Sequence, residues 1–199
     1  MPAGDGSLKV GVLAAQGAFI EHIHHLERLA VDAMPVRLPG ELRTVDALII
    51  PGGESTTISK LMLEYNLTAE IQRLAGKGLP VFGTCAGMIM ISKDIVDARG
   101  VQPLGLMDIS VRRNAFGRQT ESFETDLEIP ELGTKPFPGV FIRAPLIETV
   151  NTGTVIARLK DGKIVAAREG QFLAAAFHPE LTADLRFHKF FLDIIKGKV

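Results

Sequence analysis

The sequence has little that would point to a secreted, membrane-bound or nucleic-acid-binding protein. It contains a single cysteine, so no disulfide can form within the chain and nothing suggests an oxidising compartment. No apolar run approaches the roughly 20 residues of a membrane helix. The opening MPAGDGSLKV lacks the basic start and apolar centre of a signal peptide. A formal net charge of -1 gives no electrostatic footprint for nucleic acid or a membrane surface. We therefore expect a soluble cytoplasmic protein.

Length and composition indicate one folded unit. The chain has 199 residues, of which 46% are hydrophobic and 23% charged, as in an ordinary globular domain with a sizeable core. The Gly-, Pro- and Ser-containing start predicts a disordered tail over residues 1–7. No repeat, low-complexity tract or linker divides the remainder, so residues 8–199 are predicted to form a single domain.

The hydrophobic pattern alternates between short strands and helices in the first half. Strand-like runs lie at 9–15, 34–38, 46–50 and 79–82, and helical patterns at 18–30, 56–65, 68–77 and 88–95. The second half contains mainly strand-like runs, at 110–113, 123–129, 139–142, 154–159, 163–168 and 172–177, before a closing helix at 181–195. The pattern predicts an α/β fold. The expected architecture is a three-layer sandwich with a central, mostly parallel sheet, flanked by helices, and extra antiparallel strands in the C-terminal half.

The cysteine stands where a strand turns into a helix. Cys85 lies between Gly83 and Gly87, directly after the strand-like run 79–82. This is the setting of a nucleophile elbow, in which flanking glycines relieve crowding and the side chain stands clear of the sheet. The backbone N–H of Ala86 would then point to where an oxyanion forms. The plain alternative is a small buried cysteine in an ordinary turn.

A thiol nucleophile needs a base, and the base needs a group that orients it. His178 follows the apolar run 172–177, at the sheet edge where ligands of α/β proteins bind. Pro179 stiffens the turn and keeps Glu180 near the imidazole, so the carboxylate can accept from one ring nitrogen while the other faces Cys85. Taken alone, the His-Pro-Glu segment could equally be a solvated turn before a helix.

The other histidines give weaker signals. His22, His24 and His25 lie together on the first predicted helix, without a matching set of distant metal ligands. We interpret them as surface or interface residues. His188 is interpreted as an ordinary residue of the last helix.

A second glycine-rich turn and two arginines complete the predicted site. The segment PGGESTT at 51–57 follows a strand and opens a helix, and its Gly53 N–H is the second candidate oxyanion donor. Arg113 and Arg143 lie at strand ends, where a guanidinium can hold the carboxylate of a free amino acid with two hydrogen bonds. Most arginines in such places are simply solvated.

Together these segments resemble the triad glutamine amidotransferases. Within that group, the chain resembles the glutaminase subunits of pyridoxal 5′-phosphate synthases over almost its whole length. The segments that carry the resemblance are LAAQGA (13–18), PGGESTT (51–57), GTCAGM (83–88), RNAFGRQ (113–119), SFE (122–124), VFIRAP (140–145) and FHPELT (177–182).

The resemblance implies the chemistry and its residues. Cys85 would attack the side-chain amide of L-glutamine, and His178, oriented by Glu180, would protonate the departing ammonia before water hydrolyses the thioester. Carried over position by position, the substrate-binding residues would be Gly53, Glu54, Ser55, Arg113, Ile142 and Arg143, with Gly53 and Ala86 forming the oxyanion hole. No metal and no organic cofactor would be needed.

The resemblance also implies a partner. Ammonia would pass to a separate synthase subunit, a β/α barrel that makes pyridoxal 5′-phosphate from ribose 5-phosphate and glyceraldehyde 3-phosphate, in a complex of twelve subunits of each kind. Two other interpretations stay open from the residues. One is a glutaminase of the same class serving another pathway, or a γ-glutamyl hydrolase; the other is a non-catalytic scaffold that only stabilises a synthase.

Overall fold

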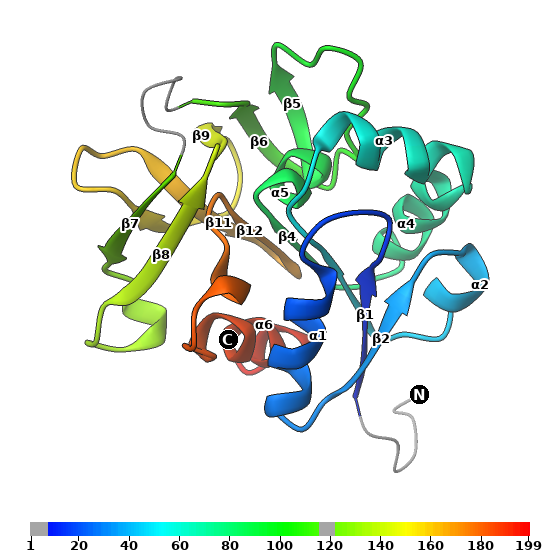
Figure 1. The fold of residues 1–199 in the computed structure, drawn as a ribbon, viewed down its shortest axis with the longest axis horizontal. Coiled ribbons are helices and arrows are strands. Elements are labelled where there is room, and N and C mark those ends of the chain that lie inside the picture. Colours follow the sequence, from blue (N-terminus) through cyan, green and yellow to red (C-terminus); the bar gives the residue numbers. More distant parts are fainter. Residues whose placement is uncertain (1–7, 116–121) are drawn as a thin grey trace.

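A ten-stranded central sheet organises the chain (Figure 1), in a computed structural model that describes residues 8–115 and 122–199. The predicted tail at 1–7 lies outside these residues. The parallel half runs in the order β2-β1-β3-β4-β12. Its strands are β1 (Lys9–Leu13), β2 (Asp32–Val36), β3 (Ala47–Ile50), β4 (Val81–Thr84) and β12 (Phe172–Ala175). Because β4 and β12 are parallel neighbours, their carboxyl ends meet at one edge.

The other half of the sheet is mainly antiparallel. Strand β11 pairs antiparallel with β12, and the order continues through β9, β6 and β5, with β10 beside β11. These strands are β5 (Ser92–Val96), β6 (Met107–Arg112), β9 (Leu146–Val150), β10 (Thr154–Arg158) and β11 (Ile164–Glu169). A separate antiparallel pair joins β7 (Ser122–Leu127) to β8 (Phe137–Ile142). The predicted fold class is confirmed.

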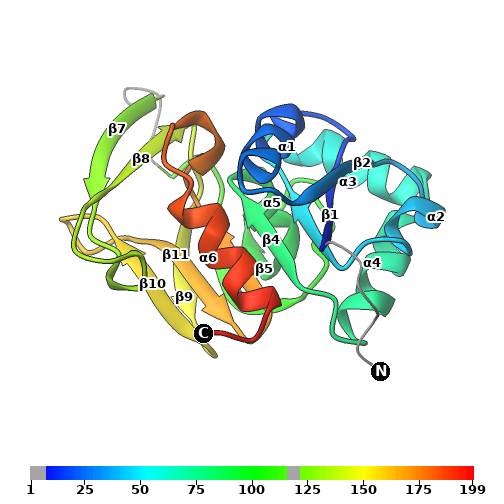
Figure 2. The same ribbon diagram turned by 90° about the horizontal axis from the view of Figure 1, so that it is seen from below.

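Helices cover both faces of the parallel half. Figures 1 and 2 show α1 (Phe19–Arg28) beside α6 (Arg186–Ile195) on one face. The other face carries α3 (Ser55–Glu64), α4 (Leu67–Ala75) and α5 (Ala86–Ile91). The short α2 (Pro39–Leu42) and the 3₁₀ turns η1 (Pro130–Leu132) and η2 (Pro179–Leu181) complete the chain. The helices thus form the outer two layers around the sheet.

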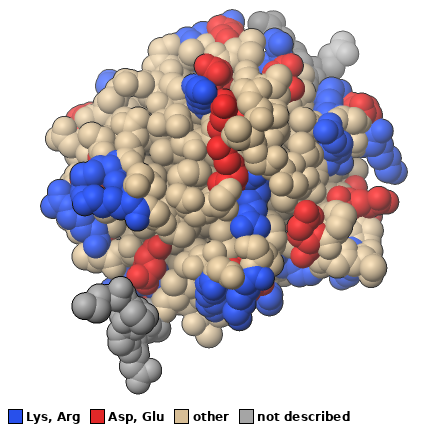
Figure 3. All heavy atoms as spheres, turned by 180° about the vertical axis from the view of Figure 1, so that it is seen from behind, with Lys and Arg blue, Asp and Glu red and all other residues tan. Residues whose placement is uncertain are grey.

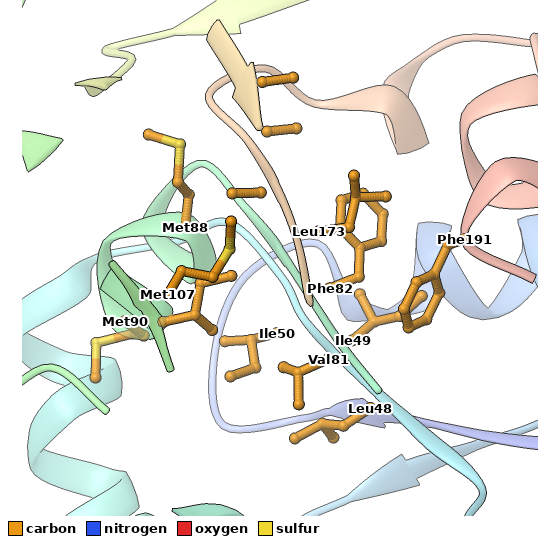
Figure 4. Packing of buried hydrophobic residues seen from close by; sticks show 14 of the residues in the cluster. Leu48, Ile49, Ile50, Val81, Phe82, Met88, Met90, Met107, Leu173 and Phe191 are labelled. Carbon is orange, nitrogen blue, oxygen red and sulfur yellow. The ribbon is translucent and has the colours of Figure 1, made fainter. Parts of the chain in front are cut away.

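Alternate side chains of the central strands fill the core on both faces. Phe82 of β4 has its ring centroid 5.6 Å from that of Phe187 and 5.4 Å from that of Phe191, both on α6. Figure 4 shows Phe191 and the α5 residues Met88 and Met90 around the same strands. All these side chains are buried, so β4 is held from both sides and its end is a rigid support for the residue that follows.

Two predicted helices differ from the observed ones. The run 88–95 is predicted to be helical throughout, but α5 ends at Ile91 and the chain continues as β5. The Ser92 hydroxyl donates to the Ile89 carbonyl at 2.8 Å, and the following residues pair with β6. The closing helix starts at Arg186 instead of residue 181, where the Arg186 N–H donates to the carboxylate of Asp184.

The surface carries charges of both signs. Figure 3 shows basic and acidic side chains interspersed with uncharged ones on the face opposite to that of Figure 1. In the part of the chain that the structure describes, no helix has both the length and the apolar character needed to cross a membrane.

Candidate active site

The turn from β4 to α5 holds Cys85 in an unusual backbone conformation. Its φ is 49° and its ψ is -106°, a combination that side chains rarely adopt. The Cys85 N–H donates to the Ala175 carbonyl at the end of β12, with a length of 2.7 Å. The residue is thus fixed between two parallel strand ends, as expected of a nucleophile elbow.

The glycines beside the cysteine are required by close backbone contacts. A Cβ on Gly87 would overlap the carbonyl oxygen of Ile50, at the end of β3. A Cβ on Gly83 would overlap the carbonyl group of Gly87 itself. The strand and helix therefore approach each other so closely that neither glycine position has room for a side chain.

His178 and Glu180 lie at the end of the neighbouring strand. The chain leaves β12 at Ala175, and the His178 N–H donates to the Val140 carbonyl of β8 at 2.8 Å. The ring Nδ1 is 2.7 Å from Oε1 of Glu180, whose side chain is completely buried. The η2 turn that starts at Pro179 brings the carboxylate back to the ring. A buried carboxylate at this distance fixes the orientation of an imidazole.

The protonation of His178 follows from its neighbours. Burial by itself lowers the pKa of this histidine, but hydrogen bonds with Cys85 and with Glu180 and the two negative charges outweigh it and raise the pKa to about 10. The imidazolium form is therefore favoured at neutral pH, next to the sulfur of Cys85. That sulfur also lies 3.9 Å from the carbonyl oxygen of Ile142.

The glycine-rich turn after β3 lies against both the thiol and the ring. A Cβ on Gly52 would overlap Cε1 of His178 and would come within 3.3 Å of the Cys85 Cβ. From the other side, Gly17 packs so tightly on the Gly52 carbonyl that it has no room for a side chain, and its φ is +88°. The amide oxygen of Gln16 accepts from the Glu54 N–H at 2.8 Å, which ties the two turns together.

Glu54 and Ser55 start helix α3. The Glu54 carboxylate accepts from the N–H groups of Thr56 and Thr57, at 3.1 and 2.7 Å, and from both hydroxyls. The hydroxyl bonds, followed by the amide bonds, outweigh burial and lower the pKa of Glu54 to about 2. Its carboxylate is therefore an N-cap, and Ser55 beside it is buried. Any contact of Glu54 with a ligand would use its backbone.

The predicted site residues line one pocket of about 270 Å³. This is near the lower limit for ligand pockets and suits a molecule the size of an amino acid. The residues predicted from the sequence that line it are Gly53, Glu54, Ser55, Cys85, Ala86, Arg113, Ile142, Arg143 and His178. Glu180 lies behind the ring of His178 and does not reach the pocket wall.

The arginines differ in their surroundings. Arg113 donates from Nη1 to the Ala98 carbonyl at 3.2 Å, whereas Arg143 is exposed and has a left-handed backbone with φ of 42°. Asn114, Ile89 and Pro145 also line the pocket, without having been predicted as site residues. The apolar pair carries no signal in a sequence, while Asn114 adjoins a predicted arginine. The segment 116–121, which covers part of the 113–119 motif, lies outside the described residues.

The interpretation of the histidine cluster was wrong for two of its three members. His24 is exposed, but His22 is fully buried and His25 is 5% exposed, so neither can form a surface contact. The sequence indicates an ordinary helical residue at His188, yet its Nε2 lies 2.8 Å from Nδ1 of His22 in the core. Polar residues usually lie on the exposed face of an amphipathic helix, so the sequence predicts a surface position for these histidines. Among the described residues, no group of three or more metal-ligating side chains could hold a metal ion.

Comparison with known proteins adds to this geometry. The SNO glutamine amidotransferase family matches residues 12–196. The pyridoxal 5′-phosphate synthase subunit PdxT of Herpetosiphon aurantiacus is 57% identical over 190 residues, which are 94% of this chain and all of that protein. The PdxT subunit of Pelotomaculum thermopropionicum is 58% identical over 187 residues, 94% of each chain.

Solved structures agree with the fold. A crystal structure of a glutamine amidotransferase superposes with a TM-score of 0.88 at 49% identity, and covers 94% of this chain and 98% of its own. A more distant glutamine amidotransferase, from Thermotoga maritima, shares the fold with a TM-score of 0.60 at 16% identity, covering 98% of this chain and 86% of its own.

Proposed function

The chain belongs to the SNO glutamine amidotransferase family, and we propose that it hydrolyses L-glutamine to L-glutamate and ammonia through a thioester on Cys85. It acts as the glutaminase subunit of a pyridoxal 5′-phosphate synthase, in line with the PdxT subunits of such synthases to which it is 52–58% identical. The ammonia is supplied to a partner synthase subunit that makes pyridoxal 5′-phosphate from ribose 5-phosphate and glyceraldehyde 3-phosphate.

One observation carries the proposal. A thiol on a strained turn opens into a pocket sized for an amino acid, and a histidine that lines the same pocket is backed by a buried carboxylate. These are the three groups that acyl transfer from an amide requires: a nucleophile, an acid–base group and an orienting partner. A scaffold that only stabilised a synthase would not need them in this arrangement.

The first half-reaction acylates Cys85. The thiolate attacks the side-chain carbonyl carbon of glutamine, and the carbonyl oxygen becomes an oxyanion. Ala86 is the first residue of α5, where a backbone N–H has no acceptor within its helix, so it can donate to this oxyanion. Gly53 in the turn that packs on Cys85 is the second donor. Collapse of the intermediate breaks the carbon–nitrogen bond, and the His178 imidazolium gives its proton to the departing ammonia.

The second half-reaction releases glutamate. Neutral His178 takes a proton from a water molecule as that water attacks the thioester carbon. The carbon–sulfur bond then breaks, so that Cys85 leaves as the thiolate and His178 is again the imidazolium. Glu180 keeps the imidazole facing the sulfur through both steps, since its carboxylate holds the far ring nitrogen at 2.7 Å.

Substrate recognition uses the rest of the pocket wall. We assign the α-carboxylate of glutamine to Arg113 and Arg143, because a guanidinium holds a carboxylate with paired hydrogen bonds. The backbone of Gly53, Glu54 and Ser55 borders the opposite side, and Ile142 contributes an apolar wall near the sulfur.

The partner and the setting follow from the same proposal. We infer a complex of twelve glutaminase and twelve synthase subunits, an arrangement that the family resemblance supports. We also place the reaction in the cytoplasm, where a single catalytic thiol is kept reduced. Neither half-reaction uses an organic cofactor or a metal.

The test is a glutaminase assay with and without the purified synthase subunit. The complex should release glutamate from glutamine, and Cys85→Ala should abolish this while still binding the synthase. That complex should make pyridoxal 5′-phosphate when ammonium salt replaces glutamine. Glutamate release by Cys85→Ala would show that the assigned nucleophile is wrong. Co-purification with a different synthetase, in place of the barrel synthase, would favour a glutaminase of another pathway.

A further inference from the structure

The carboxylate of Glu180 uses only one of its two oxygens to orient His178. The other oxygen, Oε2, belongs to a side chain with no exposed surface and has no hydrogen-bond partner among the residues that the structure describes. A buried carboxylate oxygen without a donor is costly, because water no longer solvates its charge. The site therefore needs a polar group close to Oε2.

The ring of His22 supplies such a group. Its Nε2 lies 3.4 Å from Glu180 Oε2, which is slightly long for a hydrogen bond, and 3.2 Å from the hydroxyl oxygen of Thr84. Thr84 directly precedes Cys85 at the end of β4. The imidazole thus stands between the residue before the nucleophile and the carboxylate that orients the base.

The other side of the ring fixes which nitrogen carries the proton. His22 Nδ1 lies 2.8 Å from Nε2 of His188, so one of these two nitrogens donates and the other accepts. Nδ1 of His188 is buried without a partner among the described residues. If it carried the proton, a buried N–H donor would be left unsatisfied, which costs more than an unused acceptor. His188 is therefore protonated on Nε2 and donates to His22 Nδ1.

This assignment leaves the proton of His22 on Nε2, facing Glu180. Burial, followed by the positive charges that His188, His178 and His25 would carry, lowers the pKa of His22 well below its usual value. Burial likewise lowers the pKa of His188 to about 3. Both rings are neutral, so each has one N–H, and the two are aligned in the direction of the carboxylate.

We infer that His22 is a positioning residue for glutamine hydrolysis, which directs its Nε2–H at Glu180 Oε2 and so keeps the carboxylate aimed at His178. The inference rests on the proposed glutaminase function. A chain of side chains, His188–His22–Glu180–His178–Cys85, then runs from the core of the α1–α6 contact to the nucleophile.

The experiment compares two amide substitutions at His22 in the complex with the synthase. In His22→Gln the side-chain amide reaches as far as Nε2 and can still donate to Glu180. In His22→Asn the amide ends near the position of Nδ1, so it can accept from His188 but leaves Oε2 without a donor. We expect His22→Asn to lower kcat for glutamate release about 10- to 100-fold with KM nearly unchanged, and His22→Gln to restore most of it.

A control separates positioning from core packing. His25→Asn changes another buried histidine of α1, whose ring centroid lies 4.7 Å from that of His188. Among the described residues, the ring nitrogens of His25 bond only to the backbone carbonyls of Glu21 and Thr182. The substitution should leave kcat unaltered. Equal loss of kcat in His22→Gln and His22→Asn would overturn the inference, and so would wild-type kcat in folded His22→Asn. If His22→Asn fails to fold, His22→Gln alone decides: kcat within a few-fold of wild type supports the inference, and a tenfold or larger loss overturns it.

A double substitution tests whether His22 acts through Glu180. In a Glu180→Gln background, His22→Asn should cause little further loss of kcat, because the carboxylate that His22 positions is absent. A full, independent loss would show that His22 acts elsewhere. The test also separates this inference from the proposed glutaminase function. If Cys85→Ala is inactive but His22→Asn has the kcat of the wild type, only the role of His22 is refuted.

Discussion

Replacing Glu180 with Gln tests how the site sets the protonation of its base. The substitution keeps the size and one acceptor oxygen but removes the negative charge 2.7 Å from the His178 ring. A buried hydrogen bond to a charged group contributes about 1.5–3 kcal/mol, and one pKa unit corresponds to about 1.4 kcal/mol. The pKa of His178, raised to about 10 by Cys85 and Glu180 in opposition to burial, should therefore fall by about one to two units.

The sign of the effect on activity follows from which form is active. The thiolate–imidazolium pair works below the pKa of His178 and is lost as the pH rises through it. A lower pKa moves the alkaline limb of the pH profile for kcat/KM from near 10 down to about 8–9. Loss of the orienting contact also lowers the maximum rate, by roughly 10²- to 10⁴-fold, though less than Cys85→Ala does.

The assay is glutamate release by the synthase complex between pH 6 and about 10.5, a span that covers the limbs before and after the change. Glu70→Gln is a matched control, because Glu70 is also buried and paired, with Arg43 and Arg73, but lies on α4 outside the pocket. It should leave the pH profile where it is. An alkaline limb that does not move in Glu180→Gln would refute the reasoning, since it would mean that Glu180 orients the ring without stabilising its charge.

Two further substitutions test the supports of the site. Gly87→Ala places a Cβ on the Ile50 carbonyl, so it should lower the free energy of unfolding by about 1–3 kcal/mol, measured by denaturant titration. The control Gly40→Ala, whose Cβ would have no neighbouring atom within 4 Å, should be neutral or slightly stabilising. Equal effects of the two substitutions would contradict the close contact at Gly87. Glu54→Ala should lower the free energy of unfolding by about 1 kcal/mol above pH 4.5. The difference in this free energy between the wild type and the variant should vanish as the pH falls through about 2, because the Glu54 carboxylate loses its capping charge there. A difference that stays constant with pH would exclude a charged cap.

The sequence predicts the layers of the fold and the turn that carries Cys85 from local patterns, whereas most of the other pocket residues come from the family resemblance. A strand followed by Gly83-x-Cys85-x-Gly87 favours a sharp strand-to-helix turn. A parallel sheet then brings the ends of neighbouring strands together. It failed where a boundary depends on distant partners. The run 88–95 is apolar enough for a helix, but pairing with β6 makes its second part a strand. Periodicity within the run contains no information about that partner.

The buried histidines show a second limit. A helix such as α1 is expected to bury its apolar residues and expose its polar ones, which placed His22 and His25 on the surface. Their burial becomes understandable only once α6 supplies His188 and η2 supplies Glu180. Residue 22 is far in the chain from residues 180 and 188, so no local rule links it to them. Single-sequence reasoning finds the candidate nucleophile by its turn and Glu180 by its place beside His178, but it does not find His22 and His188 behind Glu180.

The members of the proposed triad depend on the rest of the molecule in different ways. Backbone contacts fix the main chain of Cys85, through Ala175 and the two glycine positions that have no room for a side chain, so it tolerates little movement. His178 and Glu180 are instead held through side chains that reach the contact between α1 and α6. A shift of α1 relative to the sheet would therefore move the carboxylate and the imidazole while leaving the sulfur in place. Changes in α1 packing should consequently act on the alignment of the base, and hence on kcat, before they affect the nucleophile or the pocket that binds glutamine.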